Sequence, residues 1–188
     1  MKRSLIVLIT ALLTVSAAIC AEEKPAGFLC CNMRTDGSWI SDINYDDSGK
    51  HLIAVGTPVK VTGYGRYRVK IEIDGKKQEI GNDYSRDLSL DAFAKRYVVA
   101  DNPANKISNF PKKIQDAIAS ARLTKGMTRE QVLMAVGYPI SSENHSLDAK
   151  VWRFWLSSFQ EFRAKFDDSD QLSEIEGDAD TRSKVWLE

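Results

Sequence analysis

The sequence predicts an α+β protein built from two modules that follow an export signal. Residues 29–100 are predicted to form an N-terminal small all-β, barrel-like module, because apolar and charged side chains alternate there around a two-residue turn. Residues 106–180 are predicted to form a C-terminal module of two helices packed on a three-stranded antiparallel sheet. In that segment a helical spacing of apolar residues gives way to period-two alternation.

The first residues have the plan of a secretory signal peptide. Lys2 and Arg3 precede an apolar run that ends in small residues. The run is shorter than the roughly 20 apolar residues that a membrane-spanning helix needs. We therefore assign residues 1–21 to a signal peptide that is cleaved near Cys20 or Ala21. We expect the mature chain in the periplasm, or on the periplasmic face of the outer membrane, of a Gram-negative bacterium, a setting that the family resemblance given below implies.

A lipid anchor at Cys20 is the alternative outcome of export, since a lipoprotein signal also ends at a cysteine. The residue before such a cysteine is normally Gly, Ala or Ser, whereas this chain has Ile19. We therefore favour an exported protein without an anchor. Peripheral association with the membrane stays open.

Charge composition bears on the class of partner. The whole chain has 26 basic and 26 acidic residues. Removal of the signal takes away Lys2 and Arg3 and leaves 24 basic and 26 acidic residues, a formal charge of −2. A chain without net positive charge has no long-range field that attracts nucleic acid. We therefore expect no nucleic-acid partner.

Cys30 and Cys31 are the cysteines that remain once the signal is removed. In an oxidising compartment they form a vicinal disulfide or a link to a partner, or else the thiols are buried as small apolar groups. Neighbouring Cα atoms are about 3.8 Å apart, which is below the usual range for a disulfide. The sequence leaves these outcomes open, and the pair is our candidate disulfide.

The clearest element of the first module is a hairpin over residues 66–80. Its side chains alternate before the Asp74-Gly75 turn, which indicates one buried and one solvated face. Both turn residues tolerate positive φ, as a two-residue hairpin requires. Pairing across the turn sets Glu72 opposite Lys77, and Lys70 opposite Glu79. Further expected elements are a strand at Pro58–Thr62, a short helix at Leu88–Tyr97 and a module boundary at Asp101–Pro103.

Six basic residues of this module raise the question of an anionic ligand, namely Lys60, Arg66, Arg68, Lys70, Lys76 and Lys77. We favour a solvated strand face, because two of the six have acidic partners in the hairpin. The stretch Gly56–Val61, together with the hairpin, resembles the bacterial Src-homology-like small barrels of envelope and wall proteins. That resemblance implies an alternative function, a cell-wall or anionic-lipid binding module.

The second module begins with a helix that opens at Pro111, where a missing N–H costs nothing. Its apolar residues fall on one face at helical spacing, namely Ile114, Ala117, Ile118 and Ala121. After Pro139 the period becomes two in three segments, around Trp152–Leu156, Phe162–Phe166 and Ile175. Strands joined by short polar turns make an antiparallel meander.

A second helix is punctuated at both ends. Thr128 and Gln131 form a capping box, and Met127 and Val132 a hydrophobic staple. Gly137 lies just past the end, where positive φ is required. A phosphate-binding loop would need several glycines before a Lys-Ser/Thr pair, which this stretch lacks. The segment is therefore predicted to be structural, and we expect no cofactor.

The succession of Leu123–Ile140, the strand "VWRFW" and "FRAKFDDSDQLSEIEGD" resembles the SmpA/OmlA (BamE-like) domain family over residues 106–178. The residues that carry the resemblance are Lys125 to Thr128, Val132, Gly137 to Pro139, Trp152, Phe166 and Asp167. It implies a protein-binding or scaffold module that serves outer-membrane protein assembly or envelope maintenance, with another envelope protein as partner. The oligomeric state does not follow from it.

Candidates for catalysis are few, and a hydrolase is the most remote alternative. His51 and His145 lie in polar contexts without metal-ligand spacing, and Ser157 and Ser158 lie outside an elbow-type motif. The acidic run from Asp167 to Asp170 lacks the glycine and distal Glu of a calcium loop and is predicted to be a turn. We therefore expect neither an enzyme nor a metal site.

Trp155 and Arg153 are the candidate partner-docking residues. If Trp152, Phe154 and Leu156 face the helices, the residues between them face outward among charges. An exposed indole beside an arginine is the kind of residue that anchors interfaces. The alternative is that the first module of the same chain covers Trp155.

Overall fold

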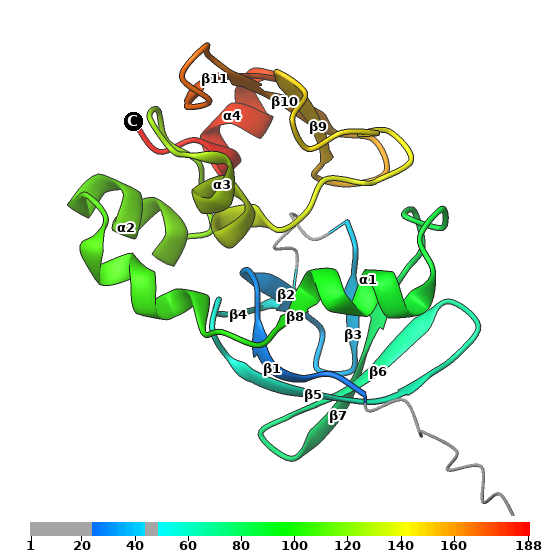
Figure 1. The fold of residues 1–188 in the computed structure, drawn as a ribbon. Coiled ribbons are helices and arrows are strands. Elements are labelled where there is room, and N and C mark those ends of the chain that lie inside the picture. The colour runs from blue at the N-terminus through cyan, green and yellow to red at the C-terminus, as the bar shows by residue number, and fades with distance from the viewer. Residues whose placement is uncertain (1–23, 44–48) are drawn as a thin grey trace, which may run out of the picture.

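The computed structural model describes residues 24–43 and 49–188 (Figure 1). The predicted signal peptide and Cys20 lie outside the described residues, so export stays a prediction. Within the described part of the chain, no helix is both long and apolar enough to cross a membrane. The fold is α+β, with a curled six-stranded sheet in the N-terminal half and a three-stranded antiparallel sheet in the C-terminal half.

The six-stranded sheet has the order β3-β7-β6-β5-β1-β8 and curls into a half-barrel (Figure 1). Its strands are β1 (Ala26–Leu29), β3 (Trp39–Ser41), β5 (Pro58–Tyr64), β6 (Arg68–Ile73), β7 (Lys76–Gly81) and β8 (Val98–Val99). All neighbouring pairs are antiparallel except β3 and β7. A separate pair is made by β2 (Met33–Thr35) and β4 (His51–Ile53). The expected barrel is therefore only half closed, with β3 and β8 as its edges.

The predicted hairpin register is confirmed. Glu72 is paired with Lys77, and Lys70 with Glu79, across β6 and β7. Asp74 and Gly75 have φ values of 50° and 74°, the left-handed conformation that this turn requires. The apolar face is buried as expected, because Val69 and Ile71 are fully inaccessible. The helix predicted at Leu88–Tyr97 is α1 (Leu90–Tyr97). It packs against the apolar face of the six-stranded sheet and forms with it the first core of the protein.

The C-terminal sheet has the order β11-β10-β9, as a meander requires. Its strands are β9 (Val151–Trp155), β10 (Glu161–Phe166) and β11 (Leu172–Glu176). The helices before it are the 3₁₀ helix η1 (Pro103–Asn109), α2 (Lys112–Ala119) and α3 (Arg129–Val136). Trp152, Phe154 and Phe162 are buried with the apolar residues of α2 and α3, and together they form the second core of the protein. The alternation predicted for these strands is therefore confirmed.

The punctuation of α3 is also confirmed. The Thr128 hydroxyl accepts a hydrogen bond from the Gln131 N–H at 3.3 Å, and the Gln131 side chain accepts one from the Thr128 N–H at 2.8 Å. Met127 and Val132 are fully buried. Gly137 caps the helix with φ 81°. Pro111, predicted as the first helical residue, is instead the N-cap of α2, one position earlier.

A further helix, α4 (Ala179–Val185), was not predicted. Its sequence is polar apart from its first and last residues, Ala179 and Val185, so apolar periodicity gives no signal. Asp178 caps it by accepting the Thr181 N–H at 2.7 Å. Val185 is fully buried in the second core, and Leu123 forms a parallel bridge with Trp186. The C-terminal half therefore has three α-helices and the 3₁₀ helix η1 beside its sheet, where two helices were expected.

The two modules pack directly on each other through Asn32, which is 3% exposed. Its side-chain amide donates to the carbonyls of Ile118 in α2, at 2.6 Å, and Ala135 in α3, at 3.1 Å. Its side-chain oxygen accepts the Val55 N–H at 2.9 Å. Val55 itself belongs to the second core. A single buried amide thus joins the two helices to the strand-rich module.

Candidate functional site

Trp155 and Arg153 lie together on the outer face of β9, as predicted. Both side chains are half-buried, whereas Trp152 and Phe154, which alternate with them along the strand, are in the core. The Arg153 guanidinium lies over the Trp155 ring, 4.7 Å from its centroid. The indole N–H donates to Glu143 at 2.7 Å. The indole is therefore held in one orientation by a cation on its face and a carboxylate at its edge.

The rest of this sheet face carries alternating charges. Arg153 pairs with Glu161 on the neighbouring strand and with Glu143 at 3.5 Å. Lys165 pairs with Glu174 and Glu176 on β11. Hydrogen bonds to these two carboxylates raise the pKa of Lys165. Exposed pairs of this kind contribute little to stability, but they keep the face around Trp155 charged and solvated.

A cavity of about 150 Å³ opens beside Trp155. The first module contributes Ile43 and Tyr84 to its wall, and the second contributes Ile140 and Glu143 as well as the indole. Of the two sequence-based alternatives for Trp155, cover by the first module is met only in part, and partner docking stays a prediction. The first module lies beside the indole, yet it leaves the indole half-exposed at a cavity that is open to solvent.

Tyr84 is positioned by a buried carboxylate. Asp42 is 4% exposed and accepts the backbone N–H groups of Asp83, Tyr84 and Ser85 at 3.3, 3.0 and 3.0 Å. Burial raises the pKa of Asp42, and these N–H donors oppose the rise. The same loop is tied to the second module, because the Ser142 hydroxyl donates to the Tyr84 carbonyl at 3.0 Å. The loop that carries Tyr84 is therefore fixed from both modules.

Phe159 and Tyr84 are site residues that the sequence reasoning missed. Phe159 is 96% exposed in the connection between β9 and β10, and Tyr84 is 45% exposed. For Phe159 a signal was present, because a large apolar residue in a polar turn between two strands cannot reach either core. No such signal marks Tyr84. Its position depends on the buried contacts of Asp42.

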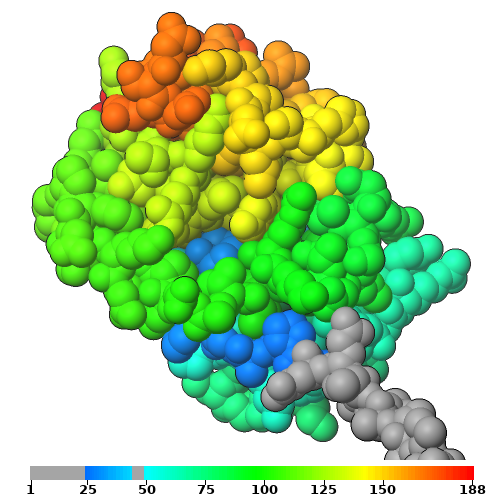
Figure 2. Space-filling view, viewed as in Figure 1, coloured from blue at the N-terminus to red at the C-terminus, as the bar shows by residue number. Residues whose placement is uncertain are grey.

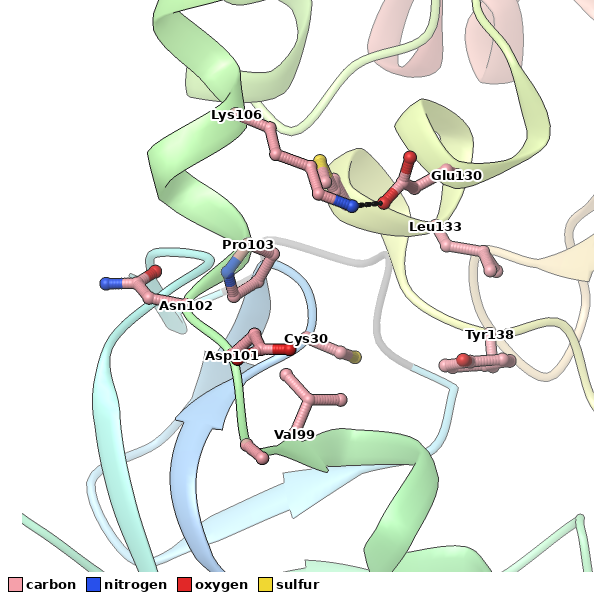
Figure 3. A pocket seen from close by; sticks show the side chains of 11 residues that line it. Cys30, Val99, Asp101, Asn102, Pro103, Lys106, Glu130, Leu133 and Tyr138 are labelled. Carbon is pink, nitrogen blue, oxygen red and sulfur yellow. Dashed lines mark hydrogen bonds and ion pairs between the residues drawn. The ribbon is translucent and has the colours of Figure 1, made fainter.

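A second candidate site is a groove of about 280 Å³ between the modules (Figure 3). One side consists of Val99 to Pro103 and Lys106, and the other of Glu130, Leu133 and Tyr138. Figure 2 shows blue atoms of the N-terminal segment at the bottom of a recess between the green η1 region and the yellow-green α3 region. The Lys106 amine and the Glu130 carboxylate form an ion pair at 2.6 Å across the groove.

Cys30 lines this groove, and its sulfur points toward Tyr138 (Figure 3). The structure joins it to Cys31 as a vicinal disulfide, with Cα atoms 3.8 Å apart. The two sulfurs differ in environment, because Cys31 is 0% exposed in the first core whereas Cys30 is partly exposed. Cys30 and Cys31 thus form a site separate from that of Trp155 and Arg153.

Tyr138 forms the aromatic wall of the groove. Its ring packs edge-on against buried Tyr97, with centroids 5.9 Å apart, and the Arg96 guanidinium lies 5.3 Å from its centroid. Burial raises the pKa of the Tyr138 hydroxyl. Tyr138 therefore stays neutral at neutral pH and offers an apolar surface with a hydroxyl at its edge.

The residues considered for catalysis and metal binding are not brought together. His51 is exposed on β4, and His145 is exposed between α3 and β9. Asp167 accepts the N–H groups of Ser169 and Gln171 at 2.9 and 3.1 Å, as a turn requires. Among residues 24–43 and 49–188, no cluster of three His, Cys, Asp or Glu side chains could hold a metal ion.

Comparison of the chain with protein-family models, curated proteins and solved structures finds no match. The C-terminal half contains helices followed by a three-stranded antiparallel sheet, as the pattern of apolar residues predicts. Since fold does not fix function, the role of the chain is argued from its two surface sites.

Proposed function

We propose that this chain is an exported, non-catalytic protein-binding module of the cell envelope. Its docking surface is the aromatic patch, by which we mean Trp155 and Tyr84 at one cavity and Phe159 in the turn that follows β9. The observation that carries this proposal is the 96% exposure of Phe159 beside a strand that presents a half-buried indole. Buried aromatic residues and arginine are the side chains that most often dominate binding energy at interfaces. Here the Trp155 indole is held by Arg153 and Glu143 of its own chain before any partner binds.

The cavity beside Trp155 bears on the chemistry of the partner. Its volume of about 150 Å³ leaves room for one side chain. Its wall combines apolar Ile43 and Ile140 with the Glu143 carboxylate at the rim. We infer that the partner is another envelope protein that inserts one aromatic or aliphatic side chain there and places basic or neutral groups around it.

Resemblance to the SmpA/OmlA family adds a context to this proposal. Members of that family serve as scaffolds in outer-membrane protein assembly or envelope maintenance, which fits a chain with an export signal and a charged outer sheet face. An envelope setting also provides the protein partner that the patch requires.

Photo-crosslinking tests the proposal. A photoreactive amino acid placed at position 159 of the exported chain should crosslink in intact cells to a discrete envelope protein. The same residue placed at position 52, a 39% exposed leucine on β4 outside the patch, should not crosslink to that protein. Phe159→Ser should then abolish capture of the crosslinked partner by the purified chain, while Leu52→Ser leaves it intact.

Stability measurements separate docking from folding in this experiment. Because Phe159 is almost fully exposed, Phe159→Ser should leave the melting temperature unchanged, within the effect normal for surface substitutions. Trp155→Ala removes a half-buried ring and should lower both the melting temperature and capture. If Phe159→Ser and Trp155→Ala retain the partner, the docking surface lies elsewhere and the proposal fails.

A second candidate function has one observation in its favour. A concavity of about 400 Å³ on the six-stranded sheet is lined by Trp39, Thr62, Lys70 and Lys77, together with Glu79. An indole beside hydroxyl, ammonium and carboxylate groups suits a wall saccharide or peptide, as the small-barrel resemblance implies. Sedimentation of the chain with purified cell-wall sacculi, and its loss on Trp39→Ala, would establish this alternative.

A further inference from the structure

We propose that the Cys30–Cys31 pair is a thiol–disulfide exchange site that receives thiols through the groove between the modules. The sulfur of Cys30 is the point of attack, and Cys31 is the resolving sulfur. The chemical class of ligand is a cysteine thiol of a peptide whose neighbouring residues are apolar. This site lies apart from the aromatic patch and does not depend on the function proposed for that patch.

Accessibility assigns the two roles. Exchange requires an incoming thiolate to approach one sulfur along the disulfide axis. Cys31 is 0% exposed and packed in the first core, so an approach to its sulfur is closed. Cys30 is partly exposed, lines the groove and directs its sulfur toward Tyr138 (Figure 3). Only Cys30 can therefore be attacked while the protein remains folded.

Exchange of the Cys30–Cys31 disulfide with an incoming thiolate needs no outside oxidant. The incoming thiolate forms a new S–S bond with the Cys30 sulfur, and the bond between Cys30 and Cys31 breaks. Its electron pair leaves on the Cys31 sulfur. The Cys31 thiolate then either attacks the Cys30 sulfur and expels the incoming thiol, or it takes a proton from solvent. A second thiolate that attacks the mixed disulfide carries away the first as a new disulfide and leaves both cysteines reduced.

Burial of Cys31 favours the return reaction. A thiolate in an apolar core is destabilised, because burial disfavours the charged form. The Cys31 thiolate loses its charge when it attacks the adjacent mixed disulfide, and this attack regenerates the vicinal disulfide. The mixed disulfide should therefore be short-lived in the wild-type chain, and it should accumulate when Cys31 is replaced.

The walls of the groove select the thiol. Val99, Leu133 and Tyr138 give an apolar surface beside Cys30, and the Lys106–Glu130 ion pair leaves little net charge on the opposite part of the groove. A peptide with apolar residues next to its cysteine gains contact with that surface. A peptide with acidic residues next to its cysteine must desolvate its carboxylates there, which disfavours its approach.

The test uses the full chain with Cys20→Ser, so that only the pair can react. Cys31→Ser leaves a single thiol in the groove, and Cys30→Ser leaves a single thiol in the core. Each variant is mixed under native conditions with glutathione disulfide, and the mixed disulfide is followed by mass spectrometry. Cys31→Ser should react at least about tenfold faster than Cys30→Ser, whose thiol must wait for local opening of the core. Equal rates for the two variants would overturn the assignment.

The chain with both cysteines supplies a second measurement in case one variant fails to fold. It is first shown by its mass to contain the disulfide when isolated from the periplasm, and two free thiols at this point would refute the proposal. It is then treated with an excess of a small thiol under native conditions, and is unfolded in denaturant and alkylated at once, so that the buried Cys31 thiol becomes accessible. Peptide mapping should find the small thiol on Cys30 and the alkyl group on Cys31, and the reverse pattern would refute the proposal.

Two short probe peptides test the groove itself. Each carries one cysteine, flanked either by leucine or by glutamate, and each is reacted with the disulfide-containing chain. The leucine peptide should exchange several-fold faster. Leu133→Glu should narrow that difference, whereas Leu52→Glu, on an exposed residue outside the groove, should leave it unchanged. If both peptides react at one rate, the groove takes no part in selecting the thiol and the stated ligand class is wrong.

Discussion

Replacement of Asn32 by Asp tests how the two modules are joined. The side-chain amide of Asn32 donates to the carbonyls of Ile118 and Ala135, and an ionised Asp has no proton to donate there. Each buried carbonyl that loses its donor costs about 1–3 kcal/mol. The Ile118 carbonyl keeps the Ala121 N–H at 3.0 Å, so its loss is partial. Together with burial of the new negative charge, the substitution should cost roughly 4 kcal/mol, a large part of the about 5–15 kcal/mol by which small domains are stable.

The variant should also acquire a distinct pH dependence. The new carboxyl is buried and faces two carbonyl oxygens, so its pKa in the folded state is raised above the unfolded value of about 3.9. A group whose folded pKa is raised binds its proton more tightly in the folded state. The stability of Asn32→Asp relative to wild type should therefore recover as the pH falls through the folded pKa, because the neutral acid can donate to one carbonyl.

Urea unfolding followed by tryptophan fluorescence measures both effects. Curves at pH 8 and at pH 5 should give a free energy of unfolding for Asn32→Asp that is about 4 kcal/mol below wild type at pH 8, with a smaller deficit at pH 5. Asn109→Asp, which places the same change on an exposed residue of η1, is the control and should leave the free energy nearly unchanged. A deficit below about 1 kcal/mol, or one equal at both pH values, would refute the reasoning.

Other predictions concern the caps and the export signal. Thr128→Ala should lower the free energy of unfolding by about 1 kcal/mol through loss of the capping hydroxyl, and Thr128→Ser should restore it; calorimetry with equal melting temperatures for all three chains would contradict this. Gly137→Val should cost more than Thr128→Ala, because a β-branched residue resists the φ of 81° at that cap. The hydrogen bond from the Thr181 N–H lowers the pKa of Asp178. The stabilisation that the Asp178 carboxylate gives is therefore present above an unfolded pKa of about 3.9 and is lost as the pH falls through the folded pKa. Asp178→Asn should keep a cap but reduce the dependence of the free energy of unfolding on pH in this acid range. Mass spectrometry of the exported chain should find an N-terminus near Ala21, and a diacylglyceryl group on Cys20 would contradict the export assignment.

Local pattern was sufficient for those elements in which neighbouring residues along the chain decide the outcome. The β6–β7 hairpin follows from Asp74-Gly75 and from alternation on either side, and both are properties of adjacent residues. The ends of α3 follow from Thr128, Gln131 and Gly137 for the same reason. The outward placement of Trp155 and Arg153 follows from the period of a strand, since every second side chain points away from the core.

Features that depend on contacts between segments far apart in the chain could not be predicted from the local sequence pattern. Helix α4 has almost no apolar stripe of its own, and it is recognised only through burial of Val185 in a core formed by other segments. The half-open form of the first sheet depends on the parallel pairing of β3 with β7 and on the short edge strand β8. Long-range pairing of this kind leaves no periodic trace in either strand.

The same distinction between local pattern and long-range contacts applies to the candidate sites. From the sequence alone, Trp155, Arg153, Cys30 and Cys31 could be singled out, because residue type and strand period mark them. Tertiary structure alone decided their surroundings: the first module lies beside Trp155 because buried Asp42 fixes the loop of Tyr84, and Cys30 faces a groove while Cys31 faces a core. The physical reason is that residue chemistry and local periodicity reside in neighbouring residues, whereas burial and cavities arise only when segments far apart in the chain meet.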